Sequence, residues 1–348
     1  VAVSRDILQR LPKTDLHVHL DGSLRAETLI ELASIIDAPL PSTDPAALRT
    51  YMRVSDARNL EDYLTRFEIT LTVMQDAEAI DRIAYELALD AAAENVWYME
   101  PRFCPALCTH RGLDAHQVVE AALRGLRRAE AETGIRGGII VCALRSLDPA
   151  HSLEMARVAV DFKNHGVVAF DLAGREAGHP PSEHLDAFRF AAEGNLAVTI
   201  HAGEAYGPPS IHEAVHLCGA RRIGHGTRLL EDPDLLAYVN DFRIPLEICL
   251  TSNVQTRVAP DYATHPLAHY LRDGLIVTLN TDNRLMSGTT VTDELWQAHR
   301  HLGMDWEHLV ELTLMGFDSA FLPHAEKKAI MDRVGDACDE IANGRTPH

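Results

Sequence analysis

The stretch LHVHLDG (residues 16–22) places two histidines, His17 and His19, one residue apart inside a short apolar run that ends at Asp-Gly. Side chains two residues apart on a strand point to the same side, so both imidazoles project from one face. Such a pair can chelate a metal ion, but each histidine can equally be a hydrogen-bonded residue of the core. The pair alone leaves both interpretations open.

This stretch lies in the first of eight short apolar runs that alternate with segments of helical periodicity. Most runs are apolar on both faces, as parallel strands covered by helices are. The runs are DLHVHL (15–20), NVWYMEPRF (95–103), GGIIVCAL (137–144), GVVAFDLAG (166–174), LAVTIHAGE (196–204), RRIGHG (221–226), IPLEICL (244–250) and LIVTLNTD (275–282). They predict an α/β protein, a (β/α)₈ TIM barrel that forms a single domain over residues 1–348.

Two regions fall outside this alternation. The gap after the first run is the longest and contains LEDYLTRFEITLTVM (60–74), whose apolar residues follow the stripe of an amphipathic helix. Beyond residue 283, further helical patterns continue toward the C-terminus. We therefore expect additional helices after the first strand and at the C-terminus, packed outside the barrel.

The composition argues against several classes of partner. Lys and Arg number 32 against 51 Asp and Glu, and the resulting net charge of −19 repels nucleic acid. No apolar run is long enough to cross a bilayer, so no membrane partner is expected. The N-terminal segment shows no signal peptide, and six scattered cysteines suit reduced thiols, so we expect a cytoplasmic location.

Further residues that can bind a metal stand at the ends of other strands. His201 closes its apolar run, His225 lies in the GHG motif, and Asp282 ends the last run. The carboxyl ends of barrel strands form one rim, so these side chains should converge there with His17 and His19. Histidines and a carboxylate suit zinc, although iron, cobalt and manganese also accept such ligands. Zinc lowers the pKa of a bound water to about 7, which would supply hydroxide at neutral pH.

Glu204 lies three residues after His201, in the loop that leaves the strand. Its position suits a proton donor that faces a metal-bound substrate. It equally suits a carboxylate in the first turn of the next helix. Position alone does not separate these two interpretations.

Five motifs, LHVHLDG, DLAG, HAGE, GHG and LNTD, resemble in their order those of the adenosine deaminase family of metal-dependent amidohydrolases. The resemblance implies one zinc ion per subunit and hydrolytic removal of ammonia from C6 of a purine nucleoside. It implies that the zinc ligands are His17, His19, His201 and Asp282. Glu204 would donate a proton to purine N1, Asp282 would accept the proton of the water, and His225 would orient the nucleophile.

The resemblance also implies substrate contacts. Asp21 would reach the ribose 5′-hydroxyl, whereas relatives that act on free adenine resemble the motif with Glu there, and Gly174 would contact purine N3. An apolar lid would cover the ribose. The implied set is His19, Asp21, Gly174, Asn283, Leu60, Tyr63, Leu64 and Phe67. From the residues alone, Asp21 and Gly174 can be turn residues, and the lid residues can be ordinary helix core.

Two positions depart from the family pattern. Asn283 stands where the family commonly has a second Asp, which would bond to purine N7 in its protonated form. An amide can donate a hydrogen bond without a raised pKa, so N7 recognition can persist. Arg175 replaces the acid that frequently follows Gly174. Both departures bear on the identity of the substrate more than on the type of reaction.

The prediction is therefore zinc-dependent hydrolytic deamination of a small-molecule purine nucleoside, adenosine and also 2′-deoxyadenosine. An alternative within the same reaction class is an aminodeoxyfutalosine deaminase or another adenine-nucleoside deaminase. An alternative of another class is a metal-bearing binding protein without turnover, which should lack a ligand or the proton donor. Nucleic-acid editing deaminases carry HxE and PCxxC signatures, which PRFCPALC does not supply.

Overall fold

The computed structural model describes residues 1–54 and 63–345. Within them, parallel strands form one curved sheet in the order β1-β2-β4-β5-β6-β7-β8-β9, and the short β3 pairs with β2. The strands are β1 (Lys13–His19), β2 (Val96–Phe103), β3 (Arg136–Gly137), β4 (Ile139–Leu144), β5 (Val167–Ala173), β6 (Ala197–Ala202), β7 (Arg222–His225), β8 (Leu246–Ile248) and β9 (Val277–Leu279). Each predicted apolar run contains a strand, so the predicted barrel strands are confirmed.

The two edges of the sheet meet between β1 and the residues that follow β9. Val18 forms a parallel bridge with Asp282. The N–H of Asp282 donates to the carbonyl of His17 at 2.8 Å, and the N–H of His19 donates to the carbonyl of Asp282 at 2.6 Å. The backbone contact that joins the edges of the barrel therefore also brings Asp282 beside both histidines of LHVHLDG.

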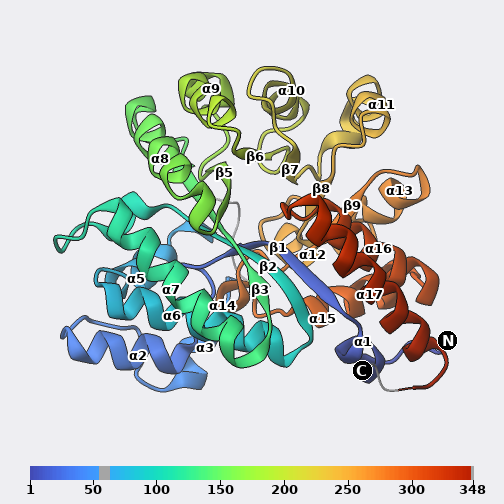
Figure 1. The fold of residues 1–348 in the computed structure, drawn as a ribbon, viewed down its shortest axis with the longest axis horizontal. Helices are drawn as coiled ribbons and strands as arrows, with labels where there is room; N and C mark the ends of the chain where they lie inside the picture. Colours follow the sequence, from blue (N-terminus) through green and yellow to red (C-terminus); the bar gives the residue numbers. More distant parts are fainter. Residues whose placement is uncertain (55–62, 346–348) are drawn as a thin grey trace.

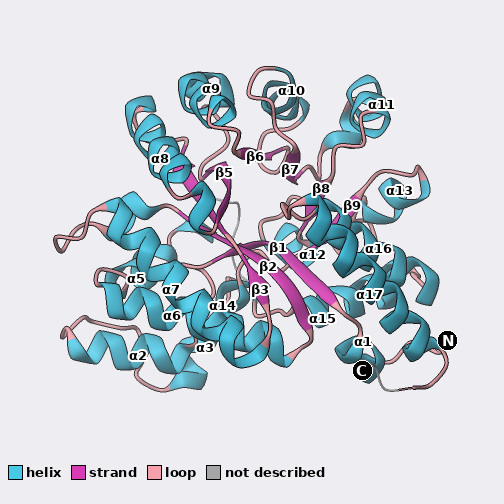
Figure 2. Ribbon diagram, viewed as in Figure 1, coloured by secondary structure: helices cyan, strands magenta, loops and turns pink. Residues whose placement is uncertain are grey.

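Helices surround the strands on the outside (Figures 1 and 2). They are α1 (Arg5–Arg10), α2 (Ala26–Ile35), α3 (Pro45–Met52), α5 (Phe67–Val73), α6 (Ala77–Ala93), α7 (Ala115–Thr133), α8 (Pro149–Asp161), α9 (Leu185–Glu193), α10 (Pro208–His216), α11 (Pro233–Asp241), α12 (Leu250–Gln255), α13 (Leu267–Arg272), α14 (Arg284–Ser287), α15 (Val291–Leu302), α16 (Trp306–Ser319) and α17 (His324–Ala342). Short 3₁₀ turns are η1 (Pro105–Cys108), η2 (Lys163–His165), η3 (Pro181–His184) and η4 (Leu229–Glu231). Among the described helices, none combines the length and apolar composition that crossing a bilayer requires.

The additional helices occupy the two predicted regions. Helices α2, α3 and α5 lie between β1 and β2 in the chain, and α14 to α17 follow β9. Helix α16 packs closely on β1, because a Cβ atom at Gly316 would lie 2.3 Å from the hydroxyl of Thr14. The predicted helix over 60–74 differs in detail: Tyr63 and Leu64 are helical, and a turn separates them from α5. Leu60 lies outside the described residues.

Asn280 provides a test of how the barrel edges are joined. Its buried Oδ1 accepts the backbone N–H of Leu16 at 2.9 Å, and its Nδ2 donates to the hydroxyl of Thr278 at 2.9 Å. Asn280→Ala would leave the Leu16 N–H without that partner in the interior, so the free energy of unfolding should fall by about 1–3 kcal/mol. Equilibrium unfolding in urea measures this change in the free energy of unfolding. The exposed Asn164→Ala control should change it by less than about 0.5 kcal/mol, and an equally small effect at Asn280 would contradict the assignment.

Candidate active site

The carboxyl ends of the strands surround a small cavity of about 40 Å³, beside a larger one of about 510 Å³. Every described residue that lines the small cavity was predicted from the sequence: His19, Tyr63, Leu64, Phe67, Gly174, His201, Glu204, His225, Asp282 and Asn283. Four of these, His19, Leu64, Phe67 and Gly174, also line the larger cavity, together with Asp21. His17 is fully buried beside the cluster. The structure therefore brings the predicted residues together, apart from Leu60, which is not described.

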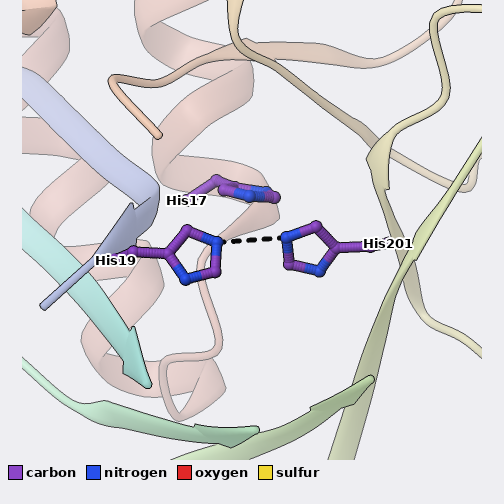
Figure 3. Close-up of side chains that lie close together, drawn as sticks. All are labelled: His17, His19 and His201. Atoms are coloured by element: carbon purple, nitrogen blue, oxygen red, sulfur yellow. Dashed lines mark hydrogen bonds between the residues drawn. The ribbon is translucent and has the colours of Figure 1, made fainter. Parts of the chain in front are cut away.

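Three histidines and one carboxylate converge in a geometry that fits a metal ion. Figure 3 shows the rings of His19 and His201 pointing at each other, with their Nε2 atoms 3.1 Å apart. Asp282 Oδ1 lies 3.5 Å from Nε2 of both His17 and His19. The buried His17 Nε2 has no hydrogen-bond partner among the described residues. Among the described residues, His17, His19 and His201 form one group whose possible ligand atoms lie within 4.8 Å of one another, and His17, His225 and Asp282 form a second. Ligand atoms about 2.1 Å from one tetrahedral ion are separated by about 3.4 Å, so the separations of 3.1 and 3.5 Å suit a divalent transition metal.

Buried carboxylates orient two of these histidines. The Nδ1–H of His17 donates to Glu247 Oε2 at 2.8 Å, and that of His201 donates to Asp171 Oδ2 at 2.9 Å. Arg102 donates to both carboxylates, at 2.9 and 3.1 Å. With the proton on Nδ1, each ring presents the lone pair of Nε2 to the cluster, which is the form that binds a metal.

These supporting residues were not predicted, although the sequence carries a signal for some of them. Glu247 and Asp171 each interrupt an otherwise apolar run, and charged residues are almost never fully buried unless they are paired. A carboxylate inside a predicted barrel strand could therefore have indicated an interior partner. Ser252 follows β8 and donates to Asp282 Oδ2 at 2.5 Å, but its sequence context carries no comparable signal.

Two carboxyl groups in the cavity have pKa values that are shifted in opposite directions. Burial, followed by the nearby charge of Asp282, raises the pKa of Glu204 well above its usual value, which favours the protonated form of this carboxyl. Burial alone would also raise the pKa of Asp282. Its interactions with His17 and the neighbouring histidines outweigh burial and hold that pKa well below the usual value. The site thus contains an acid and a base side by side.

The backbone at two strand ends is strained. His225 and Asp282 have φ angles of 62° and 58°, in the left-handed region that side chains other than glycine seldom adopt. Such residues cost about 1–3 kcal/mol each and cluster at functional sites. Gly174 has φ 93° at the end of β5, where the absent side chain relieves the same strain. Both strained side chains point into the cavity.

The remaining predicted contacts include polar atoms that are available to a ligand. Asp21 Oδ1 and Asn283 Oδ1 are buried and have no hydrogen-bond partner in the described part of the chain. Burial raises the pKa of Asp21 to about 7. Gly22 permits the close approach of Asn283, because a Cβ atom there would lie 1.7 Å from Asn283 Oδ1. The hydroxyl of Tyr63 is bonded to Ser287 Oγ at 2.9 Å.

Comparisons with known proteins agree with this geometry. The model of the family described as Adenosine deaminase matches residues 12–337. The adenosine deaminase of Mycobacterium marinum is 44% identical over 347 residues, which cover 94% of this chain and 95% of that protein. The structure of adenine deaminase from Arthrobacter aurescens is similar with a TM-score of 0.88 at 28% identity, covering 94% of this chain and 98% of that chain. The structure of N6-methyl-AMP deaminase from Arabidopsis thaliana is similar with a TM-score of 0.84 at 27% identity, covering 97% of this chain and 100% of that chain. The resemblance predicted from five motifs is confirmed.

Removing one ligand should abolish tight metal binding. His201→Ala deletes one of the converging nitrogen atoms, and Glu247→Gln weakens the hydrogen bond that orients His17. Glu247→Gln should lower the metal affinity by about 10–100-fold. His201→Ala should lower the metal affinity by more than that. Equilibrium dialysis against Zn²⁺, Co²⁺ and Mn²⁺ followed by metal analysis measures both effects. The exposed His212→Ala control should keep its metal, and full metal content in His201→Ala would contradict this site.

Proposed function

The chain belongs to the adenosine deaminase family, and from this membership we propose that it hydrolyses adenosine to inosine and ammonia, with one zinc ion per subunit. The proposal extends to 2′-deoxyadenosine. The observation that carries it is the buried Glu204, whose pKa is raised well above its usual value, in the same small cavity as His19, His201 and Asp282. All six cysteines are free and buried, which supports a cytoplasmic location as part of the proposal.

The zinc ligands in this proposal are His17, His19, His201 and Asp282. The close group of His17, His19 and His201 and the unpartnered His17 Nε2 support the three histidines. Asp282 Oδ1, 3.5 Å from Nε2 of both His17 and His19, supports the fourth ligand. Nitrogen and carboxylate ligands of this kind are those that catalytic zinc uses. Bound zinc would lower the pKa of a water molecule to about 7 and so supply hydroxide at neutral pH.

The residues around the cluster then divide the proton transfers. Glu204 donates its proton to N1 of the purine, which draws electron density away from C6 and prepares that carbon for attack. Asp282 accepts the proton of the attacking water. His225, whose Nε2 lies 3.6 Å from Glu204 Oε2, orients the nucleophile and stabilises the charge that develops as C6 becomes tetrahedral. As the tetrahedral carbon collapses, Asp282 passes its proton to the amino nitrogen and the C6–N bond breaks to release ammonia. The proton of the C6 hydroxyl returns to Glu204 as the C6 carbonyl of inosine forms.

Asp21 supports a nucleoside as the substrate. Its unpartnered Oδ1 faces the larger cavity and can accept a hydrogen bond from a ribose 5′-hydroxyl. The relative named an adenosine deaminase shares 44% identity, against 28% for the adenine deaminase and 27% for the N6-methyl-AMP deaminase. An adenine nucleoside with a larger 5′ substituent, such as aminodeoxyfutalosine, is the alternative, because Cys104 and Leu107 extend the lining of this cavity of about 510 Å³.

The zinc-loaded protein should convert adenosine to inosine, followed by the loss of adenine absorbance. Glu204→Gln keeps the shape of the side chain but removes the donated proton, so kcat should fall by about 10²–10⁴-fold with zinc content unchanged. The exposed Glu193→Gln control should retain full activity. Assays of adenosine, 2′-deoxyadenosine, adenine and 5′-modified adenosines identify the substrate. Wild-type kcat in Glu204→Gln would reject the assigned role.

The two carboxyl groups should also set the pH dependence of kcat/KM. Glu204 is active in its protonated form and its pKa is raised, so activity should be lost as the pH rises through that pKa. Asp282 is active as the carboxylate and its pKa is lowered, so activity should be lost only when the pH falls into the acid range. Steady-state kinetics across pH measure both limbs. If Glu204→Gln still loses kcat/KM at high pH, a group other than Glu204 causes that loss.

A further inference from the structure

A chain of buried hydrogen bonds leads away from His225 toward the loop that follows α12. Asn253 Nδ2 lies 3.1 Å from His225 Nδ1. Asn253 Oδ1 accepts from the hydroxyl of Thr227 at 2.9 Å and lies 3.1 Å from His265 Nε2. The backbone N–H of Leu267 donates to His265 Nδ1 at 3.1 Å. Asn253 is fully buried, and His225 and His265 expose 1% and 3% of their surface, so bulk water does not compete for these bonds.

The backbone group at the far end sets the direction of the whole chain. A peptide N–H can only donate, so His265 Nδ1 must be an acceptor. Burial lowers the pKa of His265 to about 3, so the neutral ring carries its one proton on Nε2 and donates it to Asn253 Oδ1. The amide of Asn253 is then oriented with Nδ2 toward His225. His225 Nδ1 must accept that hydrogen bond, and the proton of His225 is left on Nε2, which faces the cavity.

This arrangement is the reverse of the one found at two neighbouring histidines. His17 and His201 have carboxylates behind Nδ1, so they hold their protons there and present lone pairs to the metal cluster. His225 has an amide donor in the same place and presents an N–H. The rings of His17, His201 and His225 have centroids within 5.3 Å of one another. The group that is hydrogen-bonded to each Nδ1 atom, a carboxylate or an amide, therefore decides whether the ring presents a lone pair or an N–H at Nε2.

We propose that Asn253 and His265 are positioning residues that hold the proton of His225 on Nε2, so that His225 donates a hydrogen bond in the active site instead of binding the metal. The inference rests on the proposed function for the substrate on which that hydrogen bond acts. The direction of the hydrogen-bond chain itself depends on groups of the protein alone. Neither positioning residue lines the cavity that holds the reacting atoms.

Asn253→Asp provides the direct test, because a carboxylate can only accept from His225 Nδ1 and should move the proton there. Nitrogen-15 NMR of the imidazoles, with the His225 signal assigned by its loss in His225→Gln, reports the position of the proton in metal-free and zinc-loaded protein. We expect Nε2–H in the wild type and Nδ1–H in Asn253→Asp. We expect kcat to fall by about 100-fold or more, because a wrong histidine tautomer removes transition-state stabilisation, while KM changes by less than about threefold. The exposed Asn164→Asp adds the same charge elsewhere and should match the wild type.

A matched pair at His265 separates the hydrogen bond from the added charge. His265→Gln keeps an N–H donor near the position of Nε2 and should retain Nε2–H on His225 and most of kcat. His265→Leu removes the donor without adding charge and should give a mixture of His225 tautomers with lowered kcat. If Asn253→Asp does not fold, the comparison of His265→Gln with His265→Leu still tests the positioning role.

Two results would overturn the proposal: Nε2–H on His225 in folded Asn253→Asp, or indistinguishable tautomers in the two His265 variants. The NMR measurement needs no substrate. A wild type that deaminates none of the adenine nucleosides but shows the expected tautomers would reject the proposed function and still support the positioning role.

Discussion

The pairing of β1 with the residues that follow β9 is the contact on which the site depends. His17 and His19 lie near the start of the chain and Asp282 near its end, and the backbone hydrogen bonds that join the barrel edges run through these residues. The side chains that could hold a metal ion are therefore brought together by the pairing of the strands. A barrel opened at this seam would separate His17 and His19 from Asp282, so the closure of the barrel and the arrangement of the site depend on the same contacts.

The interior beneath the cavity is charged where most protein interiors are apolar. Arg102 lies between Asp171 and Glu247, and all three side chains are fully buried. Burying such charges brings little net stability, and removing one partner leaves an uncompensated charge that costs about 3–5 kcal/mol. Their value is better explained by the histidines they orient, because a carboxylate behind Nδ1 decides which nitrogen atom carries the lone pair.

The sequence predicts the strand ends well, because polar residues interrupt apolar runs there and the barrel topology brings those ends to one rim. It does not predict the supporting groups equally well. Glu247 has a visible signal as a charge inside an apolar strand, whereas Asn253 looks like an ordinary helix residue and His265 like an ordinary loop residue. Their effect arises from the direction of hydrogen bonds, which depends on which atoms meet in space. The turn between Leu64 and Phe67 was missed for a similar reason, since its apolar residues keep helical spacing across the break.

The loop that carries Glu204 illustrates how a buried carboxyl group is held in place without an ion pair to Lys or Arg. Glu176 accepts the backbone N–H groups of Gly203, Glu204, Ala205 and Tyr206 at 2.6 to 3.1 Å. Four donors on one carboxylate fix the backbone of the loop, so the Glu204 side chain does not need an ion pair to stay in position. An ion pair with a basic residue would lower the pKa of Glu204 and ionise it. Anchoring the backbone through Glu176 therefore holds the loop without lowering the pKa of Glu204, and the charge of Glu176 raises that pKa further.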